Sequence, residues 1–277
     1  MNLRQKTFSA VRWTTIAAGL RTSIQLVQIA VLARILNSED YGLMAMASAV
    51  VSLANIFSDM GLNGAFVQRQ DVSERQRSSL FWFSTLVSVI ICALIALASG
   101  AISIYAFSDD RLALVICMLA PTFVLNALAA PVRLAAEKEL QFKGLTIIEI
   151  LSALAAFLSA TGLALDGHGV YSLVISSIIG SVTALLLTWC YLSNGWKPAL
   201  VLKLADIRPF IGFGGALVAT NCVNHVNWTL DILLGGRIWG ASLLGFYSLP
   251  RNLVLQVQGT VNPIITNVGF PLIAKVQ

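Results

Sequence analysis

Charged residues are scarce in this sequence. Asp, Glu, Lys and Arg together make up 11% of the 277 residues, whereas a soluble domain usually carries about 25%. Hydrophobic residues make up 57% of the chain, and its mean hydropathy is +0.81. A surface with so little charge is poorly hydrated, which excludes an ordinary water-soluble domain. The composition predicts that lipid is the main solvent of the chain.

Residues that carry catalysis or bind metals are also few. The chain has two histidines, His168 and His225, and its four cysteines lie in apolar stretches without a C-x-x-C pair. The sequence shows no nucleophile motif around Ser or Cys and no loop with clustered carboxylates for metal binding or acid–base work. We therefore expect no catalytic residue, no metal site and no cofactor, and a protein that is not an enzyme.

Long apolar runs fill the sequence between the charges. A transmembrane helix needs about 20 such residues, and ionisable side chains are costly in lipid, so charges should mark the ends of the spans. The first run is too long for a secretory signal and lacks a small-residue cleavage site, so it should stay in the mature protein. We predict an all-α, polytopic transmembrane bundle of about eight spans: 13–35, 42–67, 79–101, 112–132, 145–165, 170–192, 210–234 and 244–268.

Lys and Arg are distributed unequally between the two sides of this map. One side holds thirteen of them, at 4–12, 69–77, 133–143, 197–208 and 275, while the other side holds four; Arg21, inside the first span, completes the 18. Cytoplasmic loops collect Lys and Arg. The asymmetry therefore predicts a cytoplasmic N-terminus and makes the net charge of +5 a signal of topology, with no need for a nucleic-acid partner.

Two stretches of the sequence resemble each other. Arg34-Ile35 is followed by Gly42 eight residues after the arginine, and Arg237-Ile238 is followed by Gly245 at the same interval. The offset of 203 residues superimposes the first two spans on the seventh and eighth, which suggests a duplicated unit. We predict a six-helix lobe at 1–192, a cytoplasmic amphipathic linker at 193–209 and the first two helices of a second, truncated lobe at 210–277; the alternative is a genuine eight-span protein.

Polar residues in the repeated spans recur at helical spacing. Intervals of three, four, seven and eleven residues keep side chains on one helix face, which can line a wet cavity. The stripes are Arg21, Gln25 and Gln28; Ser48, Ser52, Asn55 and Asp59; Thr220, Asn224, Asn227 and Asp231; and Arg251, Gln258 and Asn262. Single Ser, Asn or Gln residues also bond between helices, and an Asp–Arg pair can serve assembly alone. Ionisable residues in a span, however, usually mark a substrate path, a proton relay or an ion pair.

Several segments resemble the polysaccharide transporter family of Wzx-type oligosaccharide flippases, most closely its colanic-acid-exporter-like members. They are LARILNSEDYG at 32–42, ELQFK at 139–143, Phe213-Gly214 with Asn221, Asn224 and Asp231, LGFYS at 244–248, and Phe270-Pro271 with Gln277. The resemblance runs along the whole chain. It implies the fold of the multidrug and lipid-flippase superfamily, in which two six-helix lobes surround a cavity that opens alternately to each side. Family members are typically longer than this chain.

The resemblance also implies a function and a substrate. It implies a flippase of the bacterial inner membrane that moves oligosaccharide units linked to undecaprenyl pyrophosphate, with membrane lipids, a polysaccharide polymerase and glycosyltransferases as further partners. Arginine suits phosphate oxygens because its charge is permanent and its donors form a fork. We assign substrate binding to Arg21, Gln25, Gln28, Asn55, Asn224, Arg251 and Gln258, and ion coupling or charge balance to Asp59 and Asp231. The alternatives are an exporter of amphipathic small molecules, a non-transporting scaffold or a membrane-embedded glycosyltransferase.

Overall fold

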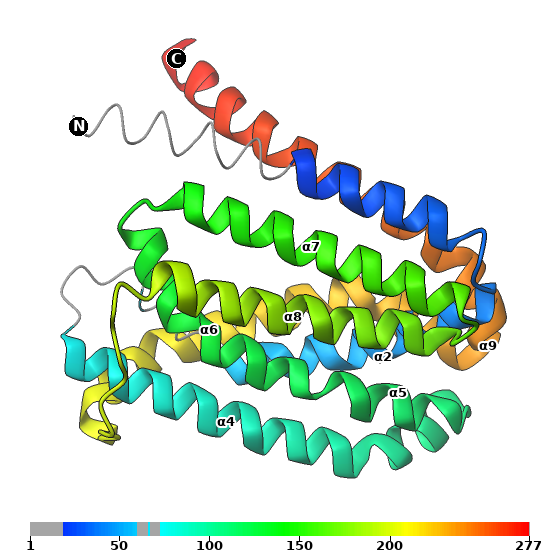
Figure 1. Ribbon diagram of the computed structural model, residues 1–277, viewed down its shortest axis with the longest axis horizontal. Helices are drawn as coiled ribbons and strands as arrows, with labels where there is room; N and C mark the ends of the chain where they lie inside the picture. The colour runs from blue at the N-terminus through cyan, green and yellow to red at the C-terminus, as the bar shows by residue number, and fades with distance from the viewer. Residues whose placement is uncertain (1–18, 60–65, 67–72, 277) are drawn as a thin grey trace.

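The helices of the protein run side by side along one long axis. The computed structural model describes residues 19–59, 66 and 73–276, with backbone only at 58–59, 204–206, 208–214, 216–217 and 260–276. Every regular element in this part is a helix (Figure 1). In chain order these are Gly19–Leu32, α2 (Ser38–Asp59), α4 (Glu74–Ala101) with its continuation η1 (Ile102–Phe107), α5 (Arg111–Leu119), α6 (Pro121–Lys138), α7 (Phe142–Leu165), α8 (Val170–Leu192) and α9 (Leu204–Val276).

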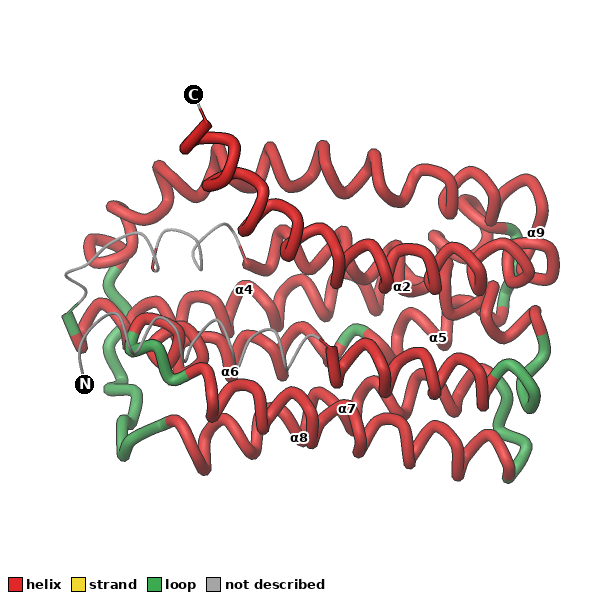
Figure 2. The backbone as a smooth tube through the Cα atoms, turned by 90° about the horizontal axis from the view of Figure 1, so that it is seen from above, coloured by secondary structure: helices red, strands yellow, loops and turns green. Residues whose placement is uncertain are grey.

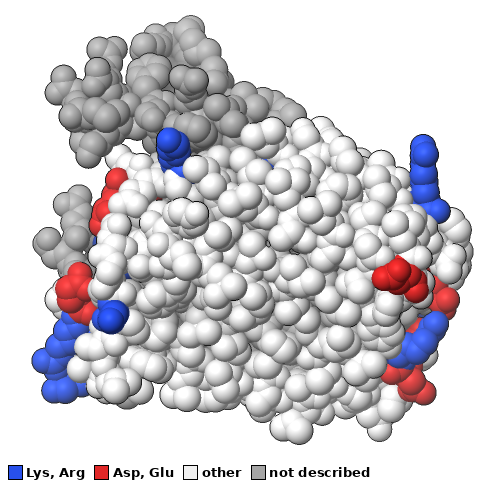
Figure 3. All heavy atoms as spheres, in the orientation of Figure 1, with Lys and Arg blue, Asp and Glu red and all other residues white. Residues whose placement is uncertain are grey.

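The length and composition of the helices confirm the predicted membrane bundle. Six described segments are long and apolar enough to cross a membrane, and Gly19–Leu32 is a shorter apolar helix. Apart from the junction of α5 and α6, the connections between helices gather at the two ends of the bundle (Figure 2). On the face shown in Figure 3, charged side chains also lie mainly near these ends, with a broad uncharged band between them. Parts of the first two predicted spans, at 13–18 and 60–67, lie largely outside the described residues.

The seventh and eighth predicted spans are joined without the loop expected at 235–243. Helix α9 continues through this stretch and reverses direction at Gly240, whose φ of 71° and ψ of 176° are not helical. Glycine adopts a positive φ at little cost because it has no Cβ. A single residue therefore replaces the expected loop and turns α9 into a hairpin, with one arm before Gly240 and one after it.

The fourth predicted span also differs from the structure. It is broken at Ala120 into α5 and α6, because Pro121 starts a new helix and its ring carries no N–H group to continue the previous one. Helix α6 then continues to Lys138, six residues beyond the predicted end at Val132. The charge rule ends a span at the first charged residue, whereas the helix itself extends past the apolar region. Arg133 therefore belongs to the helix and not to a loop.

The largest cluster of the apolar core lies at one end of the bundle, which we call the closed end. It is the end that contains residues 33–37, 108–110, 166–169 and 240 (Figure 1). The largest buried cluster gathers there from α2, α5, α8 and α9, and includes Leu43, Met46, Leu112, Val115, Ile116, Val174, Ile232 and Leu244. Lipid tails are as apolar as these side chains, so van der Waals packing holds this end together.

The segment between α8 and α9 lies at the opposite end, which we call the linker end. Residues 193–203 have no regular structure, and α9 begins inside the predicted linker 193–209. The segment is fixed to α4: the Trp82 indole donates to the Ala199 carbonyl at 2.9 Å, and the Ala199 N–H donates to the Ser78 hydroxyl at 3.2 Å. The division of the chain into two lobes at this segment stays a prediction.

Candidate functional site

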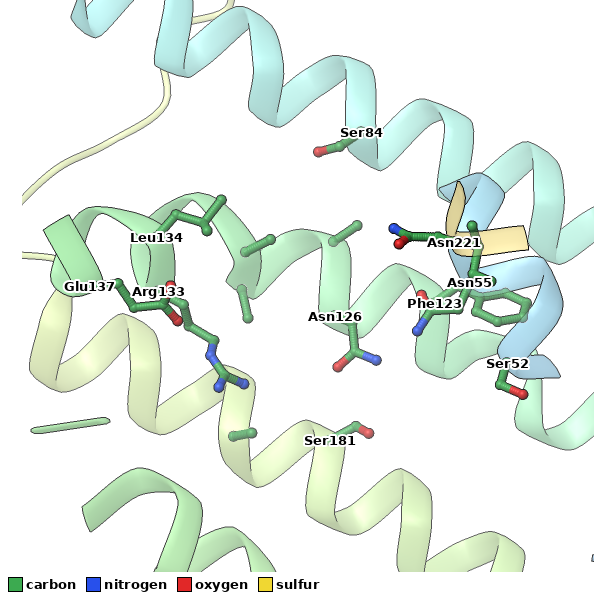
Figure 4. A pocket seen from close by; sticks show the side chains of 15 residues that line it. Ser52, Asn55, Ser84, Phe123, Asn126, Arg133, Leu134, Glu137, Ser181 and Asn221 are labelled. Atoms are coloured by element: carbon green, nitrogen blue, oxygen red, sulfur yellow. The ribbon is translucent and has the colours of Figure 1, made fainter. Parts of the chain in front are cut away.

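A polar cavity of about 550 Å³ lies between α2, α4, α6, α8 and α9. Its polar lining residues are Ser52, Asn55, Ser84, Asn126, Arg133, Glu137, Ser181 and Asn221 (Figure 4). Ser52 is 14 residues from the start of α2, or about 21 Å from the closed end. Arg133 and Glu137 lie in the last two turns of α6, at the linker end. The cavity therefore extends from the middle of the bundle towards the linker end.

Helix α6 supplies the longest polar stripe of the wall. Asn126, Ala130, Arg133 and Glu137 all line the cavity, and their intervals of four, three and four residues place them on one face of the helix. Figure 4 shows Asn126 in the middle of the cavity, with Arg133 and Glu137 at one side. The stripe thus changes from a neutral amide near the middle of the membrane to charged groups at the linker end.

The charges of the cavity form a small cluster. The Arg133 Nη2 atom lies 3.2 Å from the Glu149 Oε1 atom of α7, and their side chains are 36% and 31% exposed. Glu137 adds a second carboxylate one turn after Arg133. Because the Arg133–Glu149 pair is joined by a single contact and is partly exposed, its energetic contribution is of the order of 1 kcal/mol or less. Arg133 can therefore exchange its partner at little cost.

The other end of the cavity is bounded by a contact between two distant segments. The Ser52 hydroxyl of α2 and the His225 Nε2 atom of α9 lie 3.1 Å apart, and Ser52 is itself a lining residue. His225 is thus a hydrogen-bonded residue beside the cavity. Either partner can donate, depending on the imidazole tautomer.

The structure brings only part of the predicted site to this cavity. Among the predicted site residues whose side chains are described, Asn55 alone lines it. Gln25 and Gln28 are half-buried, and Arg21, Asn224 and Gln258 are exposed. Asp59 is the last residue of α2, and its side chain lies outside the described part. The remaining two, Asp231 and Arg251, meet each other on the α9 hairpin.

The pair of Asp231 and Arg251 is held by several bonds. The Arg251 Nε atom donates to Asp231 Oδ2 at 2.5 Å, and Nη2 donates to Oδ1 at 3.1 Å. Arg251 also donates to the Trp228 carbonyl, and the Tyr247 hydroxyl donates to Asp231 Oδ2 at 2.7 Å. The reversal at Gly240 brings these residues together from the two arms. Asp231 and Arg251 thus form an ion pair. The assignment of substrate binding to Arg251 and of ion coupling or charge balance to Asp231 stays a prediction.

Several cavity residues were not among the predicted site residues. The polar ones are Ser84, Asn126, Arg133, Glu137 and Ser181, together with Ser52, which entered only as part of a polar stripe, and Asn221, which entered only through the family resemblance. The helical spacing of Asn126, Arg133 and Glu137 could have predicted that they share one helix face. The predicted fourth span ends at Val132, however, and so leaves Arg133 and Glu137 outside the helix. Ser84 and Ser181 are isolated hydroxyls, and their sequence contexts do not separate them from other helical serines.

The sequence as a whole matches a known family. The family model described as polysaccharide biosynthesis protein matches residues 31–277. The chain belongs to this family. The chain is also 31% identical over 277 residues to the lipopolysaccharide biosynthesis protein WzxC of Escherichia coli (strain K12), a match that covers 100% of the chain and 56% of WzxC. The resemblance to Wzx-type flippases is thereby confirmed.

Other relatives of the chain are named for other polysaccharides. The teichuronic acid biosynthesis protein TuaB of Bacillus subtilis (strain 168) is 30% identical, over 99% of the chain and 56% of TuaB. A putative O-antigen transporter of Shigella flexneri is 27% identical, over 96% of the chain and 66% of that protein. The chain spans about half the length of the first two relatives, at 56% of each. No solved structure matches it.

Proposed function

We propose that this protein takes part in moving oligosaccharide units, linked to undecaprenyl pyrophosphate, across the bacterial inner membrane by alternating access. The observation that carries the proposal is the polar cavity inside an otherwise apolar bundle. A hydrophilic glycan cannot cross hydrocarbon unshielded, because each unsatisfied polar group there costs several kcal/mol. The names of the relatives, which include lipopolysaccharide biosynthesis and O-antigen transport, support the same assignment.

The cavity wall has the chemistry that a sugar requires. The Asn55, Asn126 and Asn221 amides each offer both donors and acceptors, and serine hydroxyls add groups of either kind. Sugar hydroxyls need both. Arg133 offers a planar fork of donors at the linker end, where a pyrophosphate that carries more charge than one carboxylate competes with Glu149. In this proposal the amides bind the glycan and Arg133 binds the phosphate next to it.

The orientation of the bundle is part of the proposal. The linker end includes the predicted basic side, with residues such as Arg75, Lys143 and Lys197, and the positive-inside rule assigns that side to the cytoplasm. Lipid-linked oligosaccharides made in the cytoplasm would meet the cavity from this side. The closed end would then face the outside, and the structure would correspond to an inward-facing state.

Substitutions of cavity residues test the function. In cells that make the protein, Arg133→Ala should lower export of surface polysaccharide by roughly tenfold or more, the loss expected for hydrogen bonds to a charged group, and should leave lipid-linked oligosaccharide in the inner leaflet. Arg133→Lys should retain part of the export, and Asn126→Leu should reduce it. The matched controls are Lys197→Ala and Asn252→Leu, which replace exposed residues outside the cavity lining.

The result also separates the alternatives. Export equal to that of the controls in membranes with equal amounts of Arg133→Ala and Asn126→Leu protein would contradict the assignment of the cavity. A scaffold predicts this neutral outcome. An exporter of amphipathic small molecules predicts that the variants change resistance to such compounds and leave polysaccharide unchanged.

A further inference from the structure

Two glycines bring α2 and α9 into backbone contact at the closed end. A Cβ placed on Gly42 of α2 would lie 2.6 Å from the carbonyl carbon and 2.9 Å from the Cα of Ala241, and would overlap the carbonyl oxygen. A Cβ placed on Gly245 of α9 would overlap the carbonyl of Ser38 in the same way. Real Cβ atoms do not approach backbone so closely. Only glycine therefore fits either position while the two helices remain in this contact.

The two contacts are reciprocal in sequence as well as in space. Gly245 follows Gly42 by 203 residues, and Ala241 follows Ser38 by the same 203. Gly42 thus contacts Ala241, and Gly245, the equivalent of Gly42, contacts Ser38, the equivalent of Ala241. A two-fold axis between two copies of one unit produces this isologous pattern. Each helix also carries a small-xxx-small motif, Ser38 with Gly42 and Ala241 with Gly245, which permits close helix crossing in lipid.

The surroundings of the glycines seal this end of the bundle. Met46 and Leu244 are 0% exposed. Gly236 of α9 is covered by Phe107 and Met46, because a Cβ placed there would lie 2.8 Å from the Phe107 ring and 3.1 Å from the Met46 side chain. Beside it, Arg237 donates to the Tyr105 carbonyl at 2.7 Å and to the Ser108 hydroxyl at 2.8 Å. Helix α9 is therefore joined to α2 and to the α4–η1 segment at this end.

We infer that the reciprocal contact of Gly42 and Gly245 is a gate, whose closure separates the cavity from the solution at the closed end. The transport role of this gate rests on the proposed function, while the closure itself is a property of the fold. The cavity lies on the other side of the apolar cluster, so a route through the molecule requires α2 and α9 to separate here. The absence of two Cβ atoms stabilises the closed arrangement and leaves the separated arrangement unaffected.

An added methyl group at either glycine should therefore shift the balance towards the open state. Overpacking of a tight contact is enough to change such a ratio by roughly tenfold or more. The matched control is Gly162→Ala on α7, because a Cβ at Gly162 meets nothing within 4 Å. Both kinds of variant make the same chemical change in a helix, and only one kind acts on the gate.

The accessibility of a reporter thiol measures the ratio of the open to the closed state. The natural cysteines are first replaced by serine in the whole protein, at Cys92, Cys117, Cys190 and Cys222. Ala47→Cys then places a thiol at a residue that is 0% exposed, on α2 beneath the gate. A membrane-impermeant thiol reagent is added to spheroplasts and to inside-out vesicles. From the closed-end side, Gly42→Ala and Gly245→Ala should each raise labelling by roughly tenfold or more, and Gly162→Ala should not.

A cross-linking experiment keeps the glycines in place and covers the case in which the alanine variants fail to insert. Because Ser38 contacts Gly245, which lies one turn after Ala241, Ser38→Cys and Ala241→Cys should react with a bifunctional thiol reagent longer than one helical turn of about 5.4 Å. Failure to cross-link, or labelling of inserted Gly42→Ala and Gly245→Ala proteins no greater than that of Gly162→Ala, would overturn the gate. A third outcome separates the gate from the proposed function. If labelling and cross-linking both give the expected results but the cross-linked protein still exports polysaccharide, then the contact closes this end of the bundle and the proposed translocation through the cavity is wrong.

Discussion

The two ends of the bundle are built from different residues. At the closed end, glycines allow α2 and α9 to touch, and large apolar side chains such as Met46 and Leu244 are completely buried around them. From the middle of the bundle to the linker end, Asn126 and Arg133 line a cavity of about 550 Å³. Closure thus depends on the absence of side-chain atoms at a few positions, whereas the cavity depends on polar groups at helical spacing. The following predictions test this contrast.

The largest expected effect concerns the cation that was predicted on the first helix. Arg21→Ala is predicted to abolish polysaccharide export without lowering the amount of inserted protein, and Arg21→Lys to restore part of it. Arg21 is exposed and lies 11 residues before Leu32, which packs near the closed end, so it is about 16 Å away from that end. Export measured beside Arg133→Ala compares the two arginines. Normal export by Arg21→Ala would leave the phosphate site to Arg133 alone.

The next prediction compares two glycine-to-alanine substitutions, which should change the free energy of unfolding in opposite directions. Gly162→Ala should raise the free energy of unfolding by up to about 1 kcal/mol, since alanine favours a helix over glycine. Gly245→Ala gains the same propensity but overlaps the Ser38 backbone, and we expect a net loss of roughly 1–3 kcal/mol. Thermal unfolding of the purified proteins in detergent measures both. Stabilisation by Gly245→Ala would mean that α2 and α9 separate easily.

A smaller effect is expected where charges meet on the α9 hairpin. Asp231→Ala leaves Arg251 without its carboxylate and should cost about 1–2 kcal/mol; the partial exposure of the pair, 35% and 15%, limits the loss. Asp231→Ala combined with Arg251→Ala should cost less than the sum of the single losses. If the pair serves assembly alone, export per inserted protein should stay constant across all three variants. A fall in export at unchanged stability would return both residues to a transport role.

The sequence predicted the helices better than it predicted their neighbours. The sixth span, 170–192, has the bounds of α8 at both ends, because the non-helical Gly169 precedes it and polar residues follow it. Helix α6 was cut short at Val132, since a charge marks the end of an apolar run but not the end of a helix. Helical periodicity also predicted which sides of the helices are polar, but not which residues or cavities those sides contact. Asn55 lines the cavity, whereas Arg251 contacts Asp231. The second contact forms because α9 reverses direction at Gly240, which the periodicity does not predict.

The smallest effect is expected at the exposed ion pair of the closed end. Arg111 Nη2 lies 2.5 Å from Glu39 Oε1 and 3.0 Å from Asp109 Oδ2, but the Arg111 and Glu39 side chains are 56% and 46% exposed. Water and salt screen such a pair, and Arg111 keeps Asp109 when Glu39 is changed. Glu39→Gln should therefore cost at most about 0.5 kcal/mol, and high salt should remove the difference from the unchanged protein in thermal unfolding. A larger loss that persists in salt, together with higher labelling of Ala47→Cys, would mean that this charge holds the gate shut. The expected small loss instead assigns closure to the packed glycines beneath it.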